Sequence, residues 1–403
     1  MLRTGVIADD FTGATDIASG YVRRGHRAVV VTRLEAVPSV DDDTDVVVVA
    51  LKTRTADVDD AVAASRSALT ALRAAACERF VFKYCSTFDS TDRGNIGPVL
   101  DALADDLGAA RVIVAPAFPE NGRTVQDGRL YVGDDLLEDS SMRHHPLTPM
   151  TRSRVRDLLA PQTDAAVDEL PITTVRGPGL RSAIATARGR YVVVDTLEDD
   201  DLVAVGMATA DHVLTSGSAG IALGAEPGTA DATAVVRSLT GRRLVVCGSA
   251  SARTREQVAH ARSSGVPALL LDATADDLVS STSAWLRARY AEDDRAVPVV
   301  HTVDHAGGLA AGVDQGALER TLADIVAAAV AELDVRNLII AGGETSGAVV
   351  GRLGVDRLVI GPSIAPGVCW SRTDVGATPI AIALKSGNFG AVDMFTNAWE
   401  AAR

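Results

Sequence analysis

Short apolar runs alternate with alanine-rich runs along most of this sequence, and this alternation restricts the fold more than any other feature. In the second half, apolar residues 244–247 and 337–340 lie next to the helical segments 252–263 and 317–333. Apolar runs bounded by turns are typical of buried parallel strands, and strand–helix repeats build sheets covered by helices on both faces. The sequence therefore predicts an α/β fold with mostly parallel sheets. Further strands are expected at residues 4–7, 28–31, 45–51, 80–83, 111–115, 191–195, 212–215, 268–271, 299–302 and 379–384.

Two domains are expected, because 403 residues are more than one hydrophobic core usually serves. Apolar residues make up 47% of the chain and aromatic residues only 4%, which suits α/β layers better than an aromatic-rich β-sandwich. The small, polar, proline-containing segment 224–231 (GAEPGTAD) is the best candidate for a linker. We therefore expect domains at residues 1–230 and 231–403.

Charge and composition exclude several classes of partner. The net charge of −14, with no basic stripe, argues against binding to a nucleic-acid backbone. No apolar run is long enough to cross a bilayer, and the N-terminus shows no secretory signal. The four cysteines are scattered without a CxxC pair, which indicates reduced thiols rather than a cysteine metal site. We expect a cytoplasmic protein that contacts neither membrane nor nucleic acid.

Charged residues follow the first two long apolar runs of the chain. Asp9 and Asp10 come directly after residues 4–7, and Lys52 and Arg54 follow residues 45–51. Ligands of α/β proteins usually bind beyond the carboxyl ends of the strands. One of the two aspartates is explained as a helix N-cap, and the cations could belong to a solvated loop. The alternative that we favour is a polar pocket in which cations face Asp9 and Asp10.

The segment after residues 80–83 is rich in hydroxyl and carboxyl side chains. It contains Ser86 and Asp89, and it is flanked by Lys83 and Arg93. Cations can hold a carboxylate while hydroxyl and carboxylate groups bind the hydroxyls of a polyol, so this composition suits an acid sugar. An exposed, capped loop is the alternative. Arg123, after the Asn-Gly turn at 121–122, is expected in the same pocket, and His144 and His145 are interpreted as loop residues.

Glycine-rich turns follow several strands of the second half. The run 338–347 (LIIAGGETSG) combines a buried strand, a glycine turn and the start of a helix. Such a turn can hold phosphate on backbone N–H groups, although an ordinary βα turn has the same pattern. Similar turns lie at 248–249, 306–308 and 387–390, and residues 360–370 are interpreted as a rigid Pro/Gly loop. Neither the GxxxxGK[ST] nor the GxGxxG motif is present.

Eight strings, in order along nearly the whole chain, resemble the four-carbon acid sugar kinase family. Within the family, KYCSTFDS and MRHHP resemble the branch that acts on 3-oxo-tetronates. Asp92 and Arg93 before Gly94 are partly similar to the D-threonate and D-erythronate kinases, which stay the alternative. The strings lie at residues 7–19 (IADDFTGATDIAS), 51–54 (LKTR), 82–98 (FKYCSTFDSTDRGNIGP), 121–124 (NGRT), 142–146 (MRHHP), 341–347 (AGGETSG), 361–370 (GPSIAPGVCW) and 383–390 (ALKSGNFG).

The resemblance implies a kinase that uses ATP and Mg²⁺ to phosphorylate the C4 hydroxyl of a four-carbon acid sugar. It implies an acid-sugar-binding N-terminal domain and a nucleotide-binding C-terminal domain, with the active site in a cleft between them; a homodimer stays open. Asp10, with Asp89 as second choice, is expected to orient the hydroxyl, and the metal ligands are not apparent. Substrate would contact Asp9, Lys52, Arg54, Lys83, Ser86 and Arg123, and nucleotide would contact Ser249, Ser251, Gly342, Gly343, Glu344, Thr345 and Gly387.

Two alternatives come from other functional classes. A sugar-acid sensor would use the same pocket without the glycine turns, so ATP binding distinguishes it from a kinase. A nicotinamide-linked dehydrogenase would share the α/β layout, but the absence of GxGxxG argues against it.

Overall fold

The computed structural model describes residues 3–145, 148–235, 240–273, 275–302 and 314–400. It divides into two compact units, Met1–Asp231 and Ala232–Arg403, and the division follows the segment 224–231. The glycine turn predicted at 306–308 lies outside the described residues. None of the helices in the described ranges is both long and apolar enough to span a bilayer.

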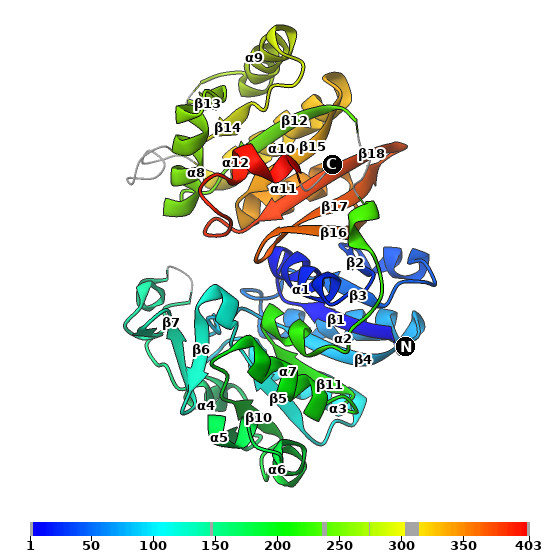
Figure 1. Cartoon of the computed structure of the whole chain (residues 1–403), viewed down its shortest axis with the longest axis vertical. Coiled ribbons are helices and arrows are strands. Elements are labelled where there is room, and N and C mark those ends of the chain that lie inside the picture. The colour runs from blue at the N-terminus through cyan, green and yellow to red at the C-terminus, as the bar shows by residue number, and fades with distance from the viewer. Residues whose placement is uncertain (1–2, 146–147, 236–239, 274, 303–313, 401–403) are drawn as a thin grey trace. The chain divides into compact units, whose positions relative to one another are not determined.

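The first unit is built on a parallel sheet with the strand order β2-β3-β1-β4-β11-β5-β10-β9 (Figure 1). The strands are β1 (Arg3–Ala8), β2 (Ala28–Val31), β3 (Val46–Ala50), β4 (Cys77–Lys83), β5 (Val112–Ala115), β9 (Val167–Leu170), β10 (Tyr191–Val194) and β11 (Leu214–Gly217). The helices are α1 (Phe11–Arg23), α2 (Val58–Ala74), α3 (Ile96–Leu107), α4 (Val155–Leu159), α5 (Ile172–Val175), α6 (Leu180–Thr186) and α7 (Asp199–Ala208).

The order of these strands determines which face each helix covers. The chain passes from β1 to β2 in one direction along the sheet and from β3 to β4 in the other. Because parallel crossovers are right-handed, α1 and α2 must cover opposite faces. Accordingly, α1 and α7 both pack against the 3₁₀ helix η5 (Ala219–Gly224), and α2 packs against α3. The direction in which successive strands are added to the sheet therefore switches between the neighbouring parallel strands β1 and β4, and this place is the reversal point of the sheet.

The second unit has the strand order β13-β14-β12-β15-β18-β17-β16, and its first five strands are parallel. The reversal point of this sheet lies between the parallel strands β12 and β15. The strands are β12 (Arg242–Cys247), β13 (Ala268–Leu270), β14 (Val299–His301), β15 (Val335–Ala341), β16 (Arg357–Ala365), β17 (Val368–Val375) and β18 (Thr378–Lys385). The helices are α8 (Ala252–Ser263), α9 (Leu278–Glu292), α10 (Gln315–Glu332), α11 (Gly343–Leu353) and α12 (Met394–Asn397).

The interpretation of residues 360–370 as a rigid loop was wrong. These residues form the end of β16, a turn at Gly367 with φ of 73°, and the start of β17, and β16, β17 and β18 pair antiparallel. Pro362 is tolerated because the register of β16 shifts between Ile360 and Ser363. Burial of Trp370 drives the pairing, since its side chain has no exposed surface.

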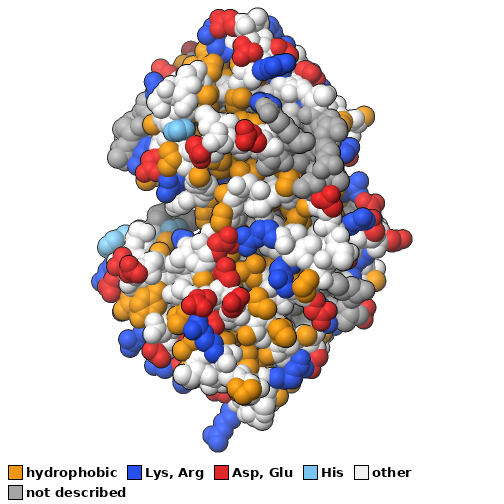
Figure 2. Space-filling view, viewed as in Figure 1, with side chains coloured by type: hydrophobic (Ala, Val, Ile, Leu, Met, Phe, Trp, Pro, Cys, Tyr) orange, Lys and Arg blue, Asp and Glu red, His pale blue; other side chains and the backbone are white. Residues whose placement is uncertain are grey.

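A small antiparallel sheet in the first unit was not predicted. It consists of β6 (Arg123–Gln126), β7 (Arg129–Val132) and β8 (Asp135–Leu136). The buried carboxylate of Asp195 anchors it by accepting hydrogen bonds from the backbone N–H groups of Asp127 and Gly128, each at 2.9 Å. On the face drawn in Figure 2, basic and acidic side chains are interspersed rather than gathered by sign.

Candidate functional site

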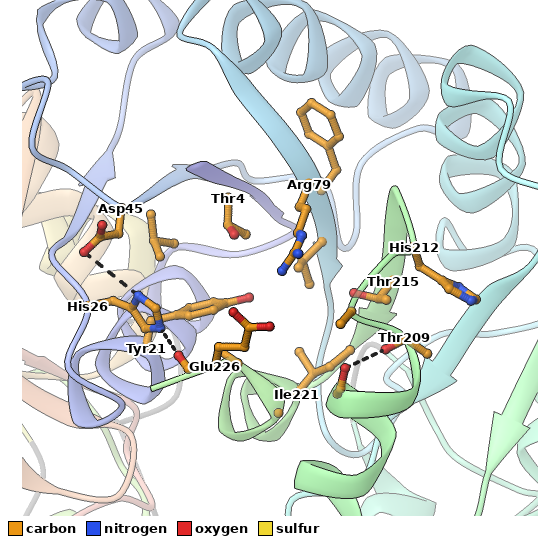
Figure 3. A pocket seen from close by; sticks show the side chains of 17 residues that line it. Thr4, Tyr21, His26, Asp45, Arg79, Thr209, His212, Thr215, Ile221 and Glu226 are labelled. Carbon is orange, nitrogen blue, oxygen red and sulfur yellow. Dashed lines mark hydrogen bonds and ion pairs between the residues drawn. The ribbon is translucent and has the colours of Figure 1, made fainter. Parts of the chain in front are cut away.

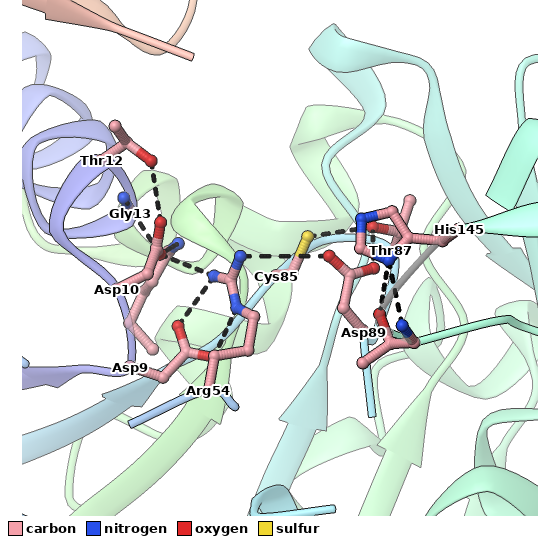
Figure 4. A network of polar contacts seen from close by, with 11 residues as sticks. Asp9, Asp10, Thr12, Gly13, Arg54, Cys85, Thr87, Asp89 and His145 are labelled. Carbon is pink, nitrogen blue, oxygen red and sulfur yellow. Dashed lines mark hydrogen bonds and ion pairs between the residues drawn. The ribbon is translucent and has the colours of Figure 1, made fainter. Parts of the chain in front are cut away.

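The reversal point between β1 and β4 brings polar side chains together at the carboxyl ends of the strands, as expected for a ligand site in an α/β sheet. Asp9 and Asp10 follow β1, Arg54 follows β3, and Lys83 is the last residue of β4. Figure 4 shows that the Arg54 guanidinium points between the two aspartates. The predicted arrangement of cations facing Asp9 and Asp10 is therefore present.

Arg54 is the centre of this network. Its Nε and Nη2 lie 3.0 and 2.9 Å from the two carboxylate oxygens of Asp9, and Nη2 lies 2.6 Å from Asp10 Oδ1. Nη1 has a carboxylate oxygen of Asp89 only at 3.9 Å, beyond hydrogen-bond distance. Because the Arg54 side chain is 23% exposed, Nη1 is a donor that a bound anion could reach.

Asp10 is both a helix cap and a member of the charged cluster. Its Oδ1 accepts from the N–H of Gly13 at 3.1 Å and lies 3.4 Å from Lys83 Nζ, and its Oδ2 accepts from the Thr12 hydroxyl at 2.7 Å. A Cβ on Gly13 would lie 1.8 Å from Lys83 Nζ, so only glycine leaves room for the lysine. The capping explanation is thus correct for Asp10 and does not exclude a second role.

The two neighbouring aspartates have opposite pKa shifts. Burial raises the pKa of Asp9, and Arg54 only partly opposes that effect. Burial acts in the same direction on Asp10, but Arg54 and Lys83 outweigh it and hold the pKa of Asp10 well below its usual range. Burial would lower the pKa of Lys83, yet Asp10 and Asp9 raise it. Asp10 and Lys83 are therefore both charged at neutral pH.

Asp89 lies on the other side of Arg54 and is held by a hydroxyl from its own loop. Its Oδ1 accepts from Thr87 at 2.6 Å, and Thr87 also contacts the sulfur of Cys85 at 2.9 Å. Burial raises the pKa of Cys85 to about 12, so the thiol stays protonated. Ser86 is half-buried in this loop and makes no hydrogen bond to the residues that the structure describes.

Two other predicted substrate residues are not joined to this network. Lys52 is exposed and forms no ion pair within the described part of the chain. Arg123 begins β6 and donates from Nη1 to the carbonyl oxygen of Asn121, while its buried Nε has no hydrogen-bond partner in the described chain. His144 ends a short 3₁₀ helix, and His145 Nδ1 accepts from the N–H of Thr148 at 3.1 Å.

In the second unit, the reversal point between β12 and β15 contains a pocket of about 340 Å³. It collects the first glycine turn after β12 and the start of α11, which are far apart in the sequence. Two side chains from α10 complete the lining. The lining residues are Gly248, Ser249, Ala250, Gln315, Glu319, Gly342, Gly343, Glu344 and Thr345.

Gly342 and Gly248 allow the backbone to approach this pocket closely. Gly342 caps α11 with φ of 131°, and a Cβ there would lie 2.9 Å from the Thr345 hydroxyl and 3.2 Å from the Ser249 nitrogen. A Cβ on Gly248 would lie 2.2 Å from the same hydroxyl. The first N–H groups of a helix have no partner inside it and carry the positive end of the helix dipole. The pocket is therefore suited to an anion such as phosphate.

Gly387 belongs to a layer beside this pocket. A Cβ on Gly387 would lie 2.2 Å from Ser249 Oγ and 2.9 Å from Ser251 Oγ. Ser251 caps α8 by accepting from the N–H of Thr254 at 3.2 Å, and the Thr254 hydroxyl donates to the carbonyl of Gly387 at 2.9 Å. The predicted nucleotide residues thus form two groups. Those at the start of α11 line the pocket, Ser251 and Gly387 lie beside it, and Ser249 belongs to both groups.

Lys385 was not predicted to be a site residue. It is the last residue of β18, and its fully buried Nζ donates to Gly387 O at 3.0 Å and Thr254 Oγ1 at 3.1 Å. It forms no ion pair with a carboxylate of the described residues. Burial lowers the pKa of Lys385 to about 8. The signal available in the sequence was a lysine directly after the apolar run 380–384 and two residues before Gly387.

Glu319 and Asp16 were also missed. Glu319 lines the pocket from α10, where nothing in its helical sequence distinguishes it from an exposed residue. Asp16 lies on α1, one turn after Thr12, and burial raises its pKa to about 6 against the opposing effect of Lys83. No group of three or more His, Cys, Asp or Glu side chains in the described ranges is placed to hold a metal ion.

Comparison with known proteins agrees with this division of roles. Residues 4–225 match the model of a sugar-binding N-terminal domain, and residues 244–395 match that of a nucleotide-binding C-terminal domain. The chain is 45% identical to the 3-oxo-tetronate kinase of Burkholderia multivorans, over 98% of this chain and 96% of that protein. It is 38% identical to the 3-oxo-tetronate kinase of Salmonella typhimurium, over 99% of both.

Two solved structures share the fold of nearly the whole chain. A crystal structure of a Salmonella typhimurium protein superposes with a TM-score of 0.86 at 37% identity, over 98% of both chains. One of a Haemophilus influenzae protein has a TM-score of 0.80 at 37% identity, over 98% of this chain and 99% of the other. The family resemblance noted in the sequence is confirmed: the chain belongs to the four-carbon acid sugar kinase family.

Proposed function

We propose that the protein transfers the γ-phosphoryl group of ATP to the C4 hydroxyl of a 3-oxo-tetronate. The main support is that relatives matching the whole chain at 38% and 45% identity carry the name 3-oxo-tetronate kinase. Two features of the chain agree with it: a cation–carboxylate cluster after β1, β3 and β4, and a glycine-lined pocket between β12 and β15.

The nucleotide is expected in the pocket of the second unit. Backbone N–H groups of Gly343, Glu344 and Thr345 at the start of α11 would hold phosphate oxygens, and Ser249 would add a hydroxyl. Ser251, Gly387 and Lys385 would support this layer from the side. Phosphoryl transfer requires chiefly positioning and compensation of charge, which such a pocket can supply.

Mg²⁺ is expected to accompany the nucleotide. It is usually held by substrate phosphates and one or two protein carboxylates, so a site of three acidic residues is not required. Glu319 and Glu344 both line the pocket and are the residues that would contact the ion. When bound, Mg²⁺ neutralises charge on the phosphoryl group that is transferred.

The acid sugar is expected at the cluster of the first unit. Arg54 Nη1 and Lys83 Nζ retain donors for a carboxylate or hydroxyl group, and the buried Nε of Arg123 has no partner among the residues that the structure describes. Asp10 is the most accessible carboxylate of the cluster at 24% exposure, against 6% for Asp9 and 8% for Asp89. Its low pKa keeps it ionised, so Asp10 can accept a hydrogen bond from the C4 hydroxyl and orient it.

The direct test is ADP release with ATP and Mg²⁺ against a panel of acceptors. The panel contains 3-dehydro-erythronate, 3-dehydro-threonate, and the D and L forms of threonate and erythronate, with a control that lacks acceptor. We expect turnover only with the two keto acids. Turnover only with threonate or erythronate would favour the tetronate kinases instead. ATP binding without turnover on any acceptor would mean that the substrate is wrong, and no ATP binding would favour a sensor.

A further inference from the structure

The first unit contains a cavity at the opposite edge of the sheet from the charged cluster. Its volume is about 90 Å³, and its lining comes from the N-terminal ends of β1 and β4, from β11 and from the end of α1 (Figure 3). Thr4 in this lining stands five residues before Asp9 along β1, which corresponds to roughly 16 Å at ~3.3 Å per residue. The cavity is therefore separate from the candidate substrate site.

Arg79 is the main charged group of this cavity. It projects from β4 into the cavity, and its half-buried guanidinium forms no hydrogen bond or ion pair with any residue in the described ranges. A guanidinium has five N–H donors in a planar fork that matches a carboxylate or phosphate group. Removing such a group from water without an anionic partner is unfavourable. Arg79 therefore presents to the cavity a cation with no anionic partner among the described residues.

Tyr21 directs a second donor at the same space. Its hydroxyl points from α1 into the cavity, the side chain is only 6% exposed, and it makes no hydrogen bond within the described chain. Burial raises the pKa of Tyr21, and the charge of Arg79 only partly opposes this effect. The phenol thus stays protonated and can donate a hydrogen bond to a ligand beside Arg79.

His26 adds an unsatisfied nitrogen. Its Nε2 lies 2.7 Å from the carbonyl oxygen of Glu226 and donates to it, so Nδ1 is the nitrogen left over. Nδ1 is buried and has no hydrogen-bond partner in the described chain, because the nearest carboxylate oxygen, Oδ2 of Asp45, lies 3.9 Å away. Thr215 in β11 contributes a further hydroxyl without a partner among the described residues. Arg79, Tyr21 and Thr215 thus direct hydrogen-bond donors at one small space, whereas His26 Nδ1, an acceptor in the neutral ring, faces Asp45.

We propose that this cavity binds a compact oxyanion, with Arg79 as the principal contact and Tyr21 as a second donor. Groups of this polarity are normally satisfied by a ligand or by ordered water. The volume is smaller than the 150 Å³ that holds a benzene ring, which suits an anionic group of the size of phosphate or a short carboxylate. The cavity shares no lining residue with the candidate substrate site, and its occupation can be measured without turnover.

Glu226 provides a way to test the sign of the site. Its exposed side chain lies at the cavity (Figure 3) and forms no ion pair with Arg79. A carboxylate here repels an anion, whereas it would strengthen binding of a cation. Glu226→Gln should therefore bind the oxyanion about fivefold more tightly, as expected for removal of one nearby like charge.

The experiment is isothermal titration of the full chain with inorganic phosphate and, separately, with sulfate and acetate. Phosphate can also bind in the second unit, so the readout is the component of binding that depends on Arg79. We expect this component to disappear in Arg79→Gln and to weaken severalfold in Tyr21→Phe. It should persist in Arg66→Gln, which removes an exposed arginine that does not line the cavity. Tighter binding of phosphate and sulfate than of acetate would identify a site for tetrahedral oxyanions, and the reverse order would identify a carboxylate site.

Two outcomes would overturn the proposal. Equal binding of all three anions by the wild type and Arg79→Gln would mean that the cavity holds only water. Weaker binding in Glu226→Gln would mean that Glu226 supports a cation site. If Arg79→Gln misfolds, Glu226→Gln still tests the proposal, because tighter anion binding is a gain that misfolding cannot produce.

Discussion

Arg54 donates to both carboxylate oxygens of Asp9, from Nε at 3.0 Å and from Nη2 at 2.9 Å. Asp9 is buried, so this two-point contact is what compensates its charge. The pair also holds Arg54 in a position where Nη1 stays available to a ligand. We therefore propose that Asp9 positions Arg54 for the substrate rather than contacting the substrate itself.

Loss of this pair should destabilise the first unit. Arg54→Gln leaves Asp9 buried without its partner, and we expect the free energy of unfolding to fall by about 3–5 kcal/mol. The measurement is urea unfolding at neutral pH. Arg66→Gln is the matched control, because Arg66 binds Asp106 at 2.9 Å in an exposed pair that should contribute less than about 1 kcal/mol. Equal effects of the two substitutions would contradict the central position of Arg54.

Asp10→Asn should impair turnover while leaving nucleotide binding intact. The amide keeps the size of the side chain but cannot orient the hydroxyl as a carboxylate does, so we expect kcat to fall about 10²-fold or more. Asp57→Asn is the control, since Asp57 caps α2 through the N–H of Asp59 and is outside the cluster. Normal kcat in Asp10→Asn together with reduced kcat in Asp89→Asn would transfer the role to Asp89.

Gly342→Ala should weaken ADP binding strongly. The residue has φ of 131°, and a Cβ would lie 2.9 Å from the Thr345 hydroxyl, so the turn that presents the N–H groups of α11 must shift. Gly351→Ala lies in the same helix with nothing within 4 Å of its Cβ, and it should bind ADP normally and be more stable by about 0.5–1 kcal/mol. Titration with ADP and thermal unfolding distinguish the two. Similar ADP affinity in both variants would argue against the α11 turn as the phosphate site.

Nucleotide affinity should depend on pH through Lys385. Its pKa is about 8 without ligand, and nearby phosphate charge would favour the protonated form and raise that pKa. The complex then binds more protons than the free protein above pH 8, so ADP affinity should fall as pH rises, by up to about tenfold per pH unit. Lys385→Met should bind ADP more weakly at pH 7 and show a flatter profile. An unchanged pH profile in Lys385→Met would exclude this lysine as the titrating group.

Asp16→Asn should stabilise the protein at neutral pH. The folded pKa of about 6 lies above the ordinary value of 3.8, so ionisation of Asp16 opposes folding, and stability decreases as pH rises from about 4 to 6. The variant lacks this penalty and should gain about 1–3 kcal/mol at pH 7, with the gain disappearing near pH 4. Urea unfolding at both pH values measures it. A gain of equal size at pH 4 would point to a cause other than ionisation.

Much of the fold could be predicted because its signals are local. Helix α8 begins and ends at the predicted residues, and each predicted apolar run overlaps a parallel strand, although 212–215 shares only its last two residues with β11 and β9 was not predicted. The failure at β16 and β17 has a physical reason. Their pairing depends on burial of Trp370 against distant residues, whereas the local Pro and Gly residues favour a loop.

The sequence by itself determined the alternation of parallel strands and helices, a glycine turn before α11, an aspartate cap at the start of α1 and the family strings, because each depends on residues that are neighbours along the chain. Only the tertiary structure decided which charged residues meet. Lys52 and Arg54 are two positions apart, yet Arg54 reaches Asp9 across 45 residues of sequence while Lys52 is exposed to solvent. The pairing of β3 with β1 makes this choice, because it brings the loop after β3 beside Asp9. Lys385 and Arg79 escaped prediction for the same reason: their surroundings are assembled from segments distant in sequence.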